Sequence, residues 1–258
     1  MRFAKLHGLG NDFVLLDLRA GGDPLPAARA LELCDRNRGI GADGVLTLLP
    51  GDRMLVQNAD GSVPEMCGNG ARCAALWIAT DGCTRPASAR VVLATDAGPR
   101  PCNVVAQSPS LGEIEVEMGV PRFEPSRALP LGNQRVDASV VSMGNPHRVL
   151  FVSGDPALLA ADFGPVLCRA ENANIEFVSR LGERRYRANV FERGAGLTQA
   201  CGTGACAVAA AAIARGEARV DEEIVVELPG GPLVLRQDGR SGELRMRGPA
   251  QLVFRGEL

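Results

Sequence analysis

An internal repeat is the feature of this sequence that most restricts its fold. Four separate segments recur later in the chain, each at an offset of 133 or 134 residues. The pairs are residues 10–11 with 144–145, 57–59 with 191–193, 67–71 with 201–205, and 91–99 with 224–232. One such match would be weak, but a shared offset at four places indicates a duplicated structural unit. The sequence therefore predicts two homologous halves.

Each half carries a cysteine just before a glycine-rich entry into an apolar run. Cys67 precedes Gly68-Asn69-Gly70-Ala71, and Cys201 precedes Gly202-Thr203-Gly204-Ala205. Unpaired backbone N–H groups and the positive end of a helix dipole stabilise negative charge at such a place. They favour a thiolate and can also hold a carboxylate. For one copy alone, a tight turn with a buried cysteine is the simpler interpretation; two matched copies favour an acid and a base on either side of an anion.

The composition excludes several classes of function. The chain has 258 residues, 46% of them hydrophobic and 22% charged, which is typical of an ordinary folded protein. The net charge of −2 gives no reason to expect nucleic acid or a membrane as partner. No apolar run approaches the ~20 residues that span a bilayer, and the N-terminus lacks the apolar core of a signal peptide. We therefore expect a cytoplasmic protein with reduced thiols.

The eight cysteines leave disulfides or a zinc site as alternatives. A chain of this size and apolar content does not need disulfides to fold. The spacings around Cys67 and Cys201 lack the CxxC pattern of common zinc sites, so we expect no metal. Four further cysteines are interpreted as small buried hydrophobic residues: Cys34, Cys83, Cys102 and Cys168.

Short apolar runs between Gly, Pro, Asn and Asp predict strands in both halves. Two long helices are predicted, over residues 71–79 and 205–215, and both are apolar on nearly all sides and therefore central. Residues 26–36 predict a peripheral amphipathic helix, and residues 220–228 and 244–254 predict closing strands. We expect an α/β fold of the α+β type with two pseudo-symmetric halves, each a mostly antiparallel sheet wrapped around a central helix, and an active site between them.

The predicted domain boundary lies where Gly and Pro interrupt residues 118–121. The N-terminal half would be residues 1–118, with Cys67, and the C-terminal half residues 119–248, with Cys201. The last strand, residues 249–258, could return to the first half, which the sequence alone does not decide.

Paired cysteines beside an anion site suit the inversion of an amino acid at its α-carbon. A base removes the α-proton from one face, and an acid returns a proton to the other. The carbanion's charge spreads into the carboxylate, so N–H donors aimed at its oxygens stabilise the transition state more than the ground state. Pyridoxal phosphate would need a Schiff-base lysine, and the only lysine, Lys5, lies in the opening strand-like segment. We therefore expect no cofactor.

Polar residues near the repeated motifs are candidates for substrate contacts. Arg193 follows Glu192 in a glycine-rich segment and could hold a carboxylate with two N–H groups, although such a pair at a strand end is as often solvated. Four asparagines lie in turn-like contexts, where each alone is more often a turn residue: Asn11, Asn58, Asn145 and Asn174. Of the two histidines, His147 is the better candidate, as a hydrogen-bonding group that orients a neighbour.

Six segments, in order and over the whole chain, resemble the diaminopimelate epimerase family. They are HGLGNDFVLLD, NADGS, CGNGARC, SMGNPH, NIEFV and ERGAGLTQACGTGAC. The resemblance implies two similar α/β halves, each with a strand-wrapped central helix. It also implies a cofactor-independent, two-base conversion of LL-2,6-diaminopimelate to the meso isomer, in lysine and peptidoglycan synthesis. A homodimer that binds this small-molecule substrate is implied as well.

The resemblance also assigns roles by position. Cys67 and Cys201 would be the acid/base pair. The backbone N–H groups of four residues would hold the carboxylate at the reacting centre: Gly68, Asn69, Gly202 and Thr203. The distal carboxylate would be held by Asn58, Asn174 and Arg193, with Glu192, Asn11 and Asn145 nearby and His147 beside the reacting centre. Two positions depart from the family pattern, Leu197 where many relatives have Glu and Gly44 where some have Gln.

Two alternatives remain open at this stage. One is another cofactor-independent racemase or epimerase on the same scaffold, acting for instance on proline or histidine derivatives. Arg193 with Asn58 and Asn174 suits a second carboxylate and favours the dicarboxylic substrate over that alternative. The other is a non-catalytic thiol or metal module in which Cys67 and Cys201 form a redox or zinc pair, and the cysteine spacing argues against it.

Overall fold

The computed structural model describes residues 1–80 and 88–258, which form two compact units. Unit 1 comprises Met1–Val116 and Arg247–Leu258, and unit 2 comprises Glu117–Met246. Cys83 lies outside the described residues. Within the described residues, no helix is long and apolar enough to cross a membrane.

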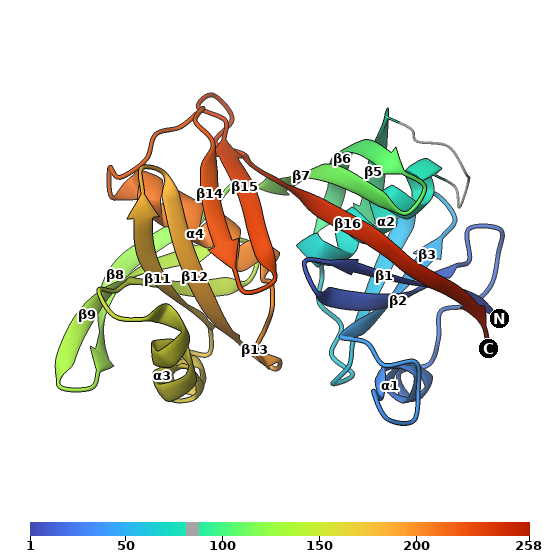
Figure 1. Cartoon of the computed structure of the whole chain (residues 1–258), viewed down its shortest axis with the longest axis horizontal. Helices are drawn as coiled ribbons and strands as arrows, with labels where there is room; N and C mark the ends of the chain where they lie inside the picture. The colour runs from blue at the N-terminus through green and yellow to red at the C-terminus, as the bar shows by residue number, and fades with distance from the viewer. Residues whose placement is uncertain (81–87) are drawn as a thin grey trace. The chain divides into compact units, whose positions relative to one another are not determined.

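The elements of the first half of the chain begin at the N-terminus with two strands joined by a glycine turn (Figure 1). They are β1 (Arg2–Gly8), β2 (Asn11–Asp17), α1 (Ala27–Cys34), β3 (Gly44–Leu49), β4 (Arg53–Asn58), α2 (Gly68–Thr80), β5 (Ser88–Thr95), β6 (Gly98–Ser108) and β7 (Leu111–Gly119).

The second half repeats this order with two additional strands, β8 at its start and the two-residue β13. Its elements are β8 (Arg122–Leu131), β9 (Gln134–Ser142), β10 (Pro146–Phe151), α3 (Pro156–Glu171), β11 (Asn174–Gly182), β12 (Arg185–Glu192), β13 (Gly196–Leu197), α4 (Gly202–Ala214), β14 (Ile224–Leu228), β15 (Gly231–Gln237) and β16 (Leu244–Glu257).

The two units have the same strand order. Neighbouring strands run β1-β2-β3-β4-β5-β6-β7 in unit 1 and β9-β10-β11-β12-β14-β15-β16 in unit 2. Parallel pairing occurs between β2 and β3, β4 and β5, β10 and β11, and β12 and β14. The pairs β1–β2, β3–β4, β5–β6 and β6–β7, and their counterparts β9–β10, β11–β12 and β14–β15, are antiparallel. The predicted fold of two pseudo-symmetric, mostly antiparallel halves is confirmed.

Each parallel pair requires a crossover connection, and each of the four crossovers contains a helix. Helices α2 and α4 cross between equivalent strands, and each has 13 residues. In α4, Gly, Ala, Val and Cys side chains are buried on all sides, because the strands of unit 2 surround the helix (Figure 1). Both central helices were predicted, and each begins three residues earlier than expected, directly after its cysteine.

Helices α1 and α3 cover the outside of their sheets (Figure 1). The peripheral helix α1 was predicted. The prediction of only two long helices is wrong, because the 16-residue α3 lies between residues 150 and 175. Its N-cap is Asp155, whose carboxylate accepts a hydrogen bond from the backbone N–H of Ala157 at 2.9 Å. Gly164 and Pro165 interrupt the helical pattern in the sequence.

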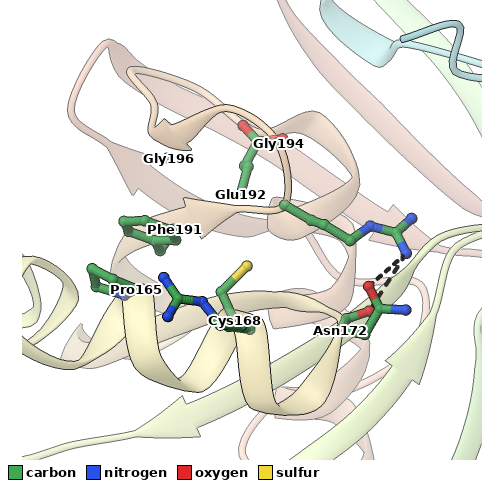
Figure 2. Close-up of a pocket in the computed structure, with 9 residues that line it drawn as sticks. Pro165, Cys168, Asn172, Phe191, Glu192, Gly194 and Gly196 are labelled. Atoms are coloured by element: carbon green, nitrogen blue, oxygen red, sulfur yellow. Dashed lines mark hydrogen bonds between the residues drawn. The ribbon is translucent and has the colours of Figure 1, made fainter. Parts of the chain in front are cut away.

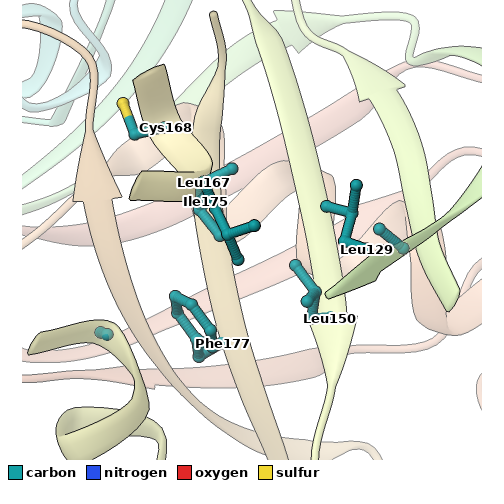
Figure 3. Close-up of a cluster of buried hydrophobic side chains, with 8 residues drawn as sticks. Leu129, Leu150, Leu167, Cys168, Ile175 and Phe177 are labelled. Atoms are coloured by element: carbon teal, nitrogen blue, oxygen red, sulfur yellow. The ribbon is translucent and has the colours of Figure 1, made fainter. Parts of the chain in front are cut away.

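The face of α3 that meets the sheet closes an apolar core. Leu167 and Cys168 of α3 pack with Leu150, Ile175 and Phe177 from β10 and β11 (Figure 3). Gly164 permits this close packing, since a Cβ there would lie 2.7 Å from Cβ of Phe191 in β12. Helix α3 therefore fixes the position of β12 and of the residues that follow it.

Strand β16 passes from one unit to the other. Its first residues, Leu244–Met246, belong to unit 2, and the remainder belongs to unit 1. There it pairs antiparallel with β1, from Arg2 opposite Glu257 to His7 opposite Gln251. The last strand thus returns to the first half of the chain. Strand β8, which follows the crossover, pairs with β9 in the equivalent place in unit 2.

Candidate active site

Both cysteines stand at the N-terminus of a central helix. Cys201 is the N-cap of α4, and its Sγ accepts a hydrogen bond from the backbone N–H of Gly204 at 3.3 Å. Sγ of Cys67 accepts the equivalent bond from Gly70 at 3.4 Å. A sulfur that caps a helix in this way lies at the positive end of its dipole. The helix N-terminus by itself favours a thiolate, and at Cys201 burial opposes it.

The residues around Cys67 form a polar network within unit 1. The Asn69 side-chain amide donates to Oδ1 of Asn11 at 3.0 Å, and Asn11 donates to Oδ2 of Asp43 at 2.7 Å. Arg72, whose side chain is fully buried, donates to Oδ1 of Asn69 at 2.8 Å and to the Pro249 carbonyl at 3.1 Å. Asn69 is therefore held on both sides, and its place in the Cys67 loop is fixed.

The residues around Cys201 form an equivalent network within unit 2. Asn145 donates from Nδ2 to Oγ1 of Thr203 at 3.3 Å, and Oγ1 of Thr203 lies 3.6 Å from Sγ of Cys201. Nε2 of His147 lies 2.9 Å from Oδ1 of Asn145. The contact of Asn145 with Thr203 repeats that of Asn11 with Asn69, at the same separation of 58 residues in the chain. The internal repeat thus extends to side-chain contacts.

Glycines with positive φ set the direction of both asparagines. Gly10 has φ +81° and Gly144 has φ +98°, a region that favours glycine. Each allows the chain to turn directly before Asn11 or Asn145. The repeated Gly-Asn pair therefore places an amide side chain against each cysteine loop.

The environment of Cys201 is acidic. Burial raises the pKa of its thiol well above the ordinary value, and the charges of Glu192 and Glu176 raise it further. Burial likewise raises the pKa of Glu192, opposed by hydrogen bonds from Thr198, at 2.5 Å, and from the Cys201 thiol. An acidic group and a thiol in contact can pass a proton between them, so this pair has the chemistry of an acid/base site.

The remaining polar residues proposed for the site are placed at strand ends. Oδ1 of the buried Asn174 accepts a hydrogen bond from the backbone N–H of Arg193 at 2.9 Å. Asn58 ends β4 and donates to the hydroxyl of Ser62 at 2.9 Å. Its side chain contacts a turn and is not connected by these hydrogen bonds to the network of Asn11 and Asn69.

A cavity of about 410 Å³ lies within unit 2 beside Glu192 and Arg193 (Figure 2). Pro165, Cys168 and Phe191 supply its apolar wall. The Arg193 guanidinium reaches across to Asn172, at 3.3 Å from Oδ1 and 3.5 Å from the carbonyl oxygen. Arg193 thus lines the cavity and is exposed.

Two departures from the family pattern lie beside these residues without disrupting them. Leu197 is exposed and pairs with Phe191 in the short β13 ladder, while the adjacent Thr198 donates to Glu192. A Cβ on Gly44 would lie 2.7 Å from the Gln57 carbonyl oxygen, so close backbone approach explains the glycine.

The other thiols that the structure describes have a packing role, as expected. Cys34, Cys102 and Cys168 are buried, and burial raises the pKa of Cys34 to about 11. Over residues 1–80 and 88–258, no group of three His, Cys, Asp or Glu side chains is arranged to hold a metal ion.

Sequence reasoning missed three residues of these networks. Asp43 and Arg72 anchor the Cys67 loop, and Glu176 lies against His147 with Oε1 2.6 Å from Nδ1. Glu176 did carry a signal, because it is a charged residue inside the apolar run NIEFV of a buried strand.

Comparison with known proteins decides the family. The family model described as diaminopimelate epimerase matches residues 3–124 and 139–253. The chain belongs to the diaminopimelate epimerase family. It is 40% identical to a diaminopimelate epimerase of a Synechocystis species, over 100% of this chain and 98% of the relative. A diaminopimelate epimerase of Xanthomonas euvesicatoria is also 40% identical, with 100% and 96% covered. Membership of this family makes the chain an isomerase.

Solved structures outside the immediate relatives share the fold of this epimerase family. A predicted epimerase of Pseudomonas aeruginosa superposes with a TM-score of 0.76 at 19% identity, covering 100% of this chain and 98% of the other. A hydroxyproline epimerase of Agrobacterium vitis gives a TM-score of 0.74 at 14% identity, covering 99% and 91%. At these identities the likeness concerns the fold alone.

Proposed function

We propose that this epimerase converts LL-2,6-diaminopimelate to meso-diaminopimelate by a two-base mechanism in which Cys67 and Cys201 carry the protons. The observation that carries the proposal is that two cysteines in equivalent places cap the central helices of a chain from this family. A helix N-terminus favours both a thiolate and a bound carboxylate. The proposed substrate is the one in the names of the related diaminopimelate epimerases.

The reaction needs one thiolate and one thiol. The thiolate takes the α-proton and becomes a thiol, leaving the electron pair on the α-carbon. The other cysteine gives its proton to the opposite face and becomes a thiolate. The stereocentre is inverted, and the two sulfurs have exchanged protonation states. The reverse reaction then begins from the exchanged state. Because the two cysteines carry both protons, the scheme requires no cofactor.

Backbone donors would stabilise the carbanion. In this scheme the N–H groups of Gly68, Asn69, Gly202 and Thr203, in the first turns of α2 and α4, hold the carboxylate of the reacting centre. The first N–H groups of a helix have no partner within the helix and point along its axis. As charge moves from the α-carbon into the carboxylate, these bonds strengthen, which lowers the barrier.

The distal carboxylate would be recognised by Arg193 with Asn58 and Asn174. The Arg193 guanidinium can hold a carboxylate with two hydrogen bonds. Oδ1 of Asn174 accepts a hydrogen bond from the backbone N–H of Arg193 and so fixes the backbone there. Glu192, in contact with Thr198 and Cys201, would exchange protons with the thiol. The cytoplasmic location stays a prediction from the sequence, and the homodimer and the role in lysine and peptidoglycan synthesis are further predictions from the family resemblance.

Replacement of each cysteine tests the two-base scheme. Cys67→Ala and Cys201→Ala should each lower the rate of epimerisation about 10²–10⁴-fold, because each removes an obligatory proton carrier. Cys73→Ala and Cys206→Ala are matched controls, since these buried thiols lie in the same helices, and they should keep activity. Near-normal turnover by either Cys67→Ala or Cys201→Ala would contradict the scheme.

Exchange of the α-proton for deuterium tests the substrate. Intact protein in D₂O should exchange the α-protons of LL-diaminopimelate and leave proline and hydroxyproline unchanged. Exchange with proline and none with diaminopimelate would instead assign the chain to the racemases whose fold it shares.

A further inference from the structure

A continuous line of polar side chains connects a buried carboxylate to the Cys201 thiol. Oε1 of Glu176 lies 2.6 Å from Nδ1 of His147, and Nε2 of His147 lies 2.9 Å from Oδ1 of Asn145. Nδ2 of Asn145 donates to Oγ1 of Thr203 at 3.3 Å, and Oγ1 lies 3.6 Å from Sγ of Cys201. All five residues belong to unit 2. We call this line the Glu176 relay.

The amide of Asn145 fixes the direction of every bond in the relay. Its Oδ1 can only accept, so Nε2 of His147 carries a proton and donates it. Its Nδ2 can only donate, so it occupies a lone pair of the Thr203 oxygen. The hydroxyl proton of Thr203 is then available to point at the Cys201 sulfur. A hydroxyl that donates to sulfur favours the thiolate over the thiol.

The first link requires a second proton on the same ring. With Nε2 already protonated, the 2.6 Å contact between Nδ1 and Oε1 must also contain a proton. Imidazole is ordinarily a stronger base than a carboxylate, which places that proton on nitrogen. Oε1 also lies 3.0 Å from where a Cβ on Gly204 would be, at the start of α4. The helix dipole there favours an ionised carboxylate.

Burial of both side chains favours a charged pair of His147 and Glu176. The His147 and Glu176 side chains are both 0% exposed, and Oε2 of Glu176 has no hydrogen-bond partner within the described structure. A buried carboxylate with an unsatisfied oxygen destabilises the fold unless its other oxygen is paired with a positive charge. The doubly protonated ring of His147 supplies that charge.

The equivalent network in unit 1 has the opposite polarity. There Asn69 donates to Asn11, and Asn11 donates to Asp43, so both bonds point away from the cysteine loop. The residue equivalent to Thr203 is Asn69, which has no hydroxyl. The repeat thus conserves the contact between the two side chains and reverses its direction, so a donor aimed at sulfur belongs to the Cys201 side.

We propose that Glu176 is a positioning residue, which holds His147 with both ring nitrogens protonated and thereby aims the Thr203 hydroxyl at the Cys201 sulfur. The kinetic consequence rests on the proposed role of Cys201 as a proton carrier. The protonation of the ring does not rest on it. The two can therefore be tested separately.

Nuclear magnetic resonance of ¹⁵N-labelled histidine tests the ring directly. The chain has two histidines, so His7→Gln leaves His147 as the only imidazole signal. In that protein both ring nitrogens should carry a proton at neutral pH. Glu176→Gln should leave one protonated nitrogen, because a neutral amide does not balance the charge of a doubly protonated ring. Asp43→Asn, the matched change behind Asn11, should leave the His147 signals unchanged.

A single protonated nitrogen in the His7→Gln protein would overturn the proposal, even if Glu176→Gln did not fold. So would a ring that keeps both protons in Glu176→Gln, since Glu176 would then only fill space. Neither result depends on catalysis.

Kinetics test the end of the relay. Thr203→Val removes the hydroxyl with little change in shape and should lower kcat about tenfold, the scale of one lost hydrogen bond, with KM within twofold. Thr203→Ser should restore kcat, and Glu176→Gln should lower it in the same direction. Equal kcat in Thr203→Val and Thr203→Ser would refute the relay. No epimerisation of diaminopimelate by the unmodified protein would refute the proposed function and leave the result on the ring standing.

Discussion

The glycine three residues after each cysteine controls where the sulfur lies. A Cβ on Gly204 would lie 3.0 Å from Oε1 of Glu176 and 3.2 Å from Sγ of Cys201. A Cβ on Gly70 would lie 3.6 Å from Sγ of Cys67, and its one close contact would be Cδ2 of Leu46 at 2.8 Å. The end of a leucine side chain can move, whereas the Glu176 carboxylate is held by His147. The two equivalent glycines therefore differ in how far they tolerate a side chain.

We predict that Gly204→Ala lowers kcat at least about tenfold, while Gly70→Ala has a smaller effect. Alanine favours a helix over glycine by about 1 kcal/mol, so neither change should prevent α2 or α4 from forming. The loss at Gly204 would come from displacement of the Cys201 sulfur and the Glu176 carboxylate. Steady-state kinetics and thermal unfolding of both variants check this. An unaltered kcat in Gly204→Ala would show that the space around this sulfur is not restrictive.

The sequence identified the residues with a recognisable local pattern and missed those defined by tertiary contact. Cys67, Cys201 and the Gly-Asn pairs follow from the repeat, and the structure places an asparagine against each cysteine loop. Arg72 lies in the predicted central helix, but its partner at Pro249 is 177 residues away in the chain. No local pattern indicates such a contact.

At the scale of elements, a charged cluster ties β1, β2 and the segment between α1 and β3 together. Lys5 is buried and contacts Asp12 at 2.5 Å, and it also donates to the Gly41 carbonyl. Arg36 donates to Asp12 and to Asp43 at 2.7 Å each. Burial alone would raise the pKa of Asp12, but the hydrogen bonds from Arg36 and Lys5 outweigh it and lower the pKa to about 2. The ionised form of Asp12 therefore stabilises unit 1.

Asp12→Asn should lower the free energy of unfolding by about 2 kcal/mol at pH 7, the value of a pKa lowered from 3.8 to about 2. Since the folded pKa is below the unfolded one, this contribution is complete above pH 4 and is lost as the pH falls through 2. The difference between the two proteins should shrink over that range in urea unfolding. Asp96→Asn, which breaks an exposed pair with Arg53, is the control and should cost under about 1 kcal/mol. A difference independent of pH would contradict the assignment.

Helix α3 shows how tertiary packing overrides local preference. Glycine and proline in sequence argue against a helix, and Gly164-Pro165 lies in the middle of this one. The glycine is required by the approach of Phe191. Burial of Leu167, Ile175 and Phe177 in the core beneath α3 then stabilises the helix. Helices α2 and α4 were predictable because their apolar runs are uninterrupted.

At the scale of the whole chain, the last strand of the second half completes unit 1. The chain leaves unit 1 through β7 and then forms β8, which pairs with β9. It leaves unit 2 through β16, whose later residues pair with β1. The repeat predicted two halves, but the partner of the last strand could not be predicted, because that pairing joins residues about 250 positions apart. We therefore expect the folding of unit 1 to require residues 247–258.

Removal of residues 248–258 should unfold unit 1 and leave unit 2 folded. The deletion removes the ladder between β16 and β1 and the Pro249 carbonyl that accepts from the buried Arg72. Several ladder bonds at about 1 kcal/mol each, and a buried guanidinium N–H left without that acceptor at about 1–3 kcal/mol, exceed about 4 kcal/mol together. Hydrogen exchange with mass spectrometry should find slow amides in residues 122–237 and fast exchange in α2. Deletion of Leu258 alone, which breaks an exposed contact with Met1, should leave both units protected. Protection of α2 in the longer deletion would show that unit 1 folds without its last strand.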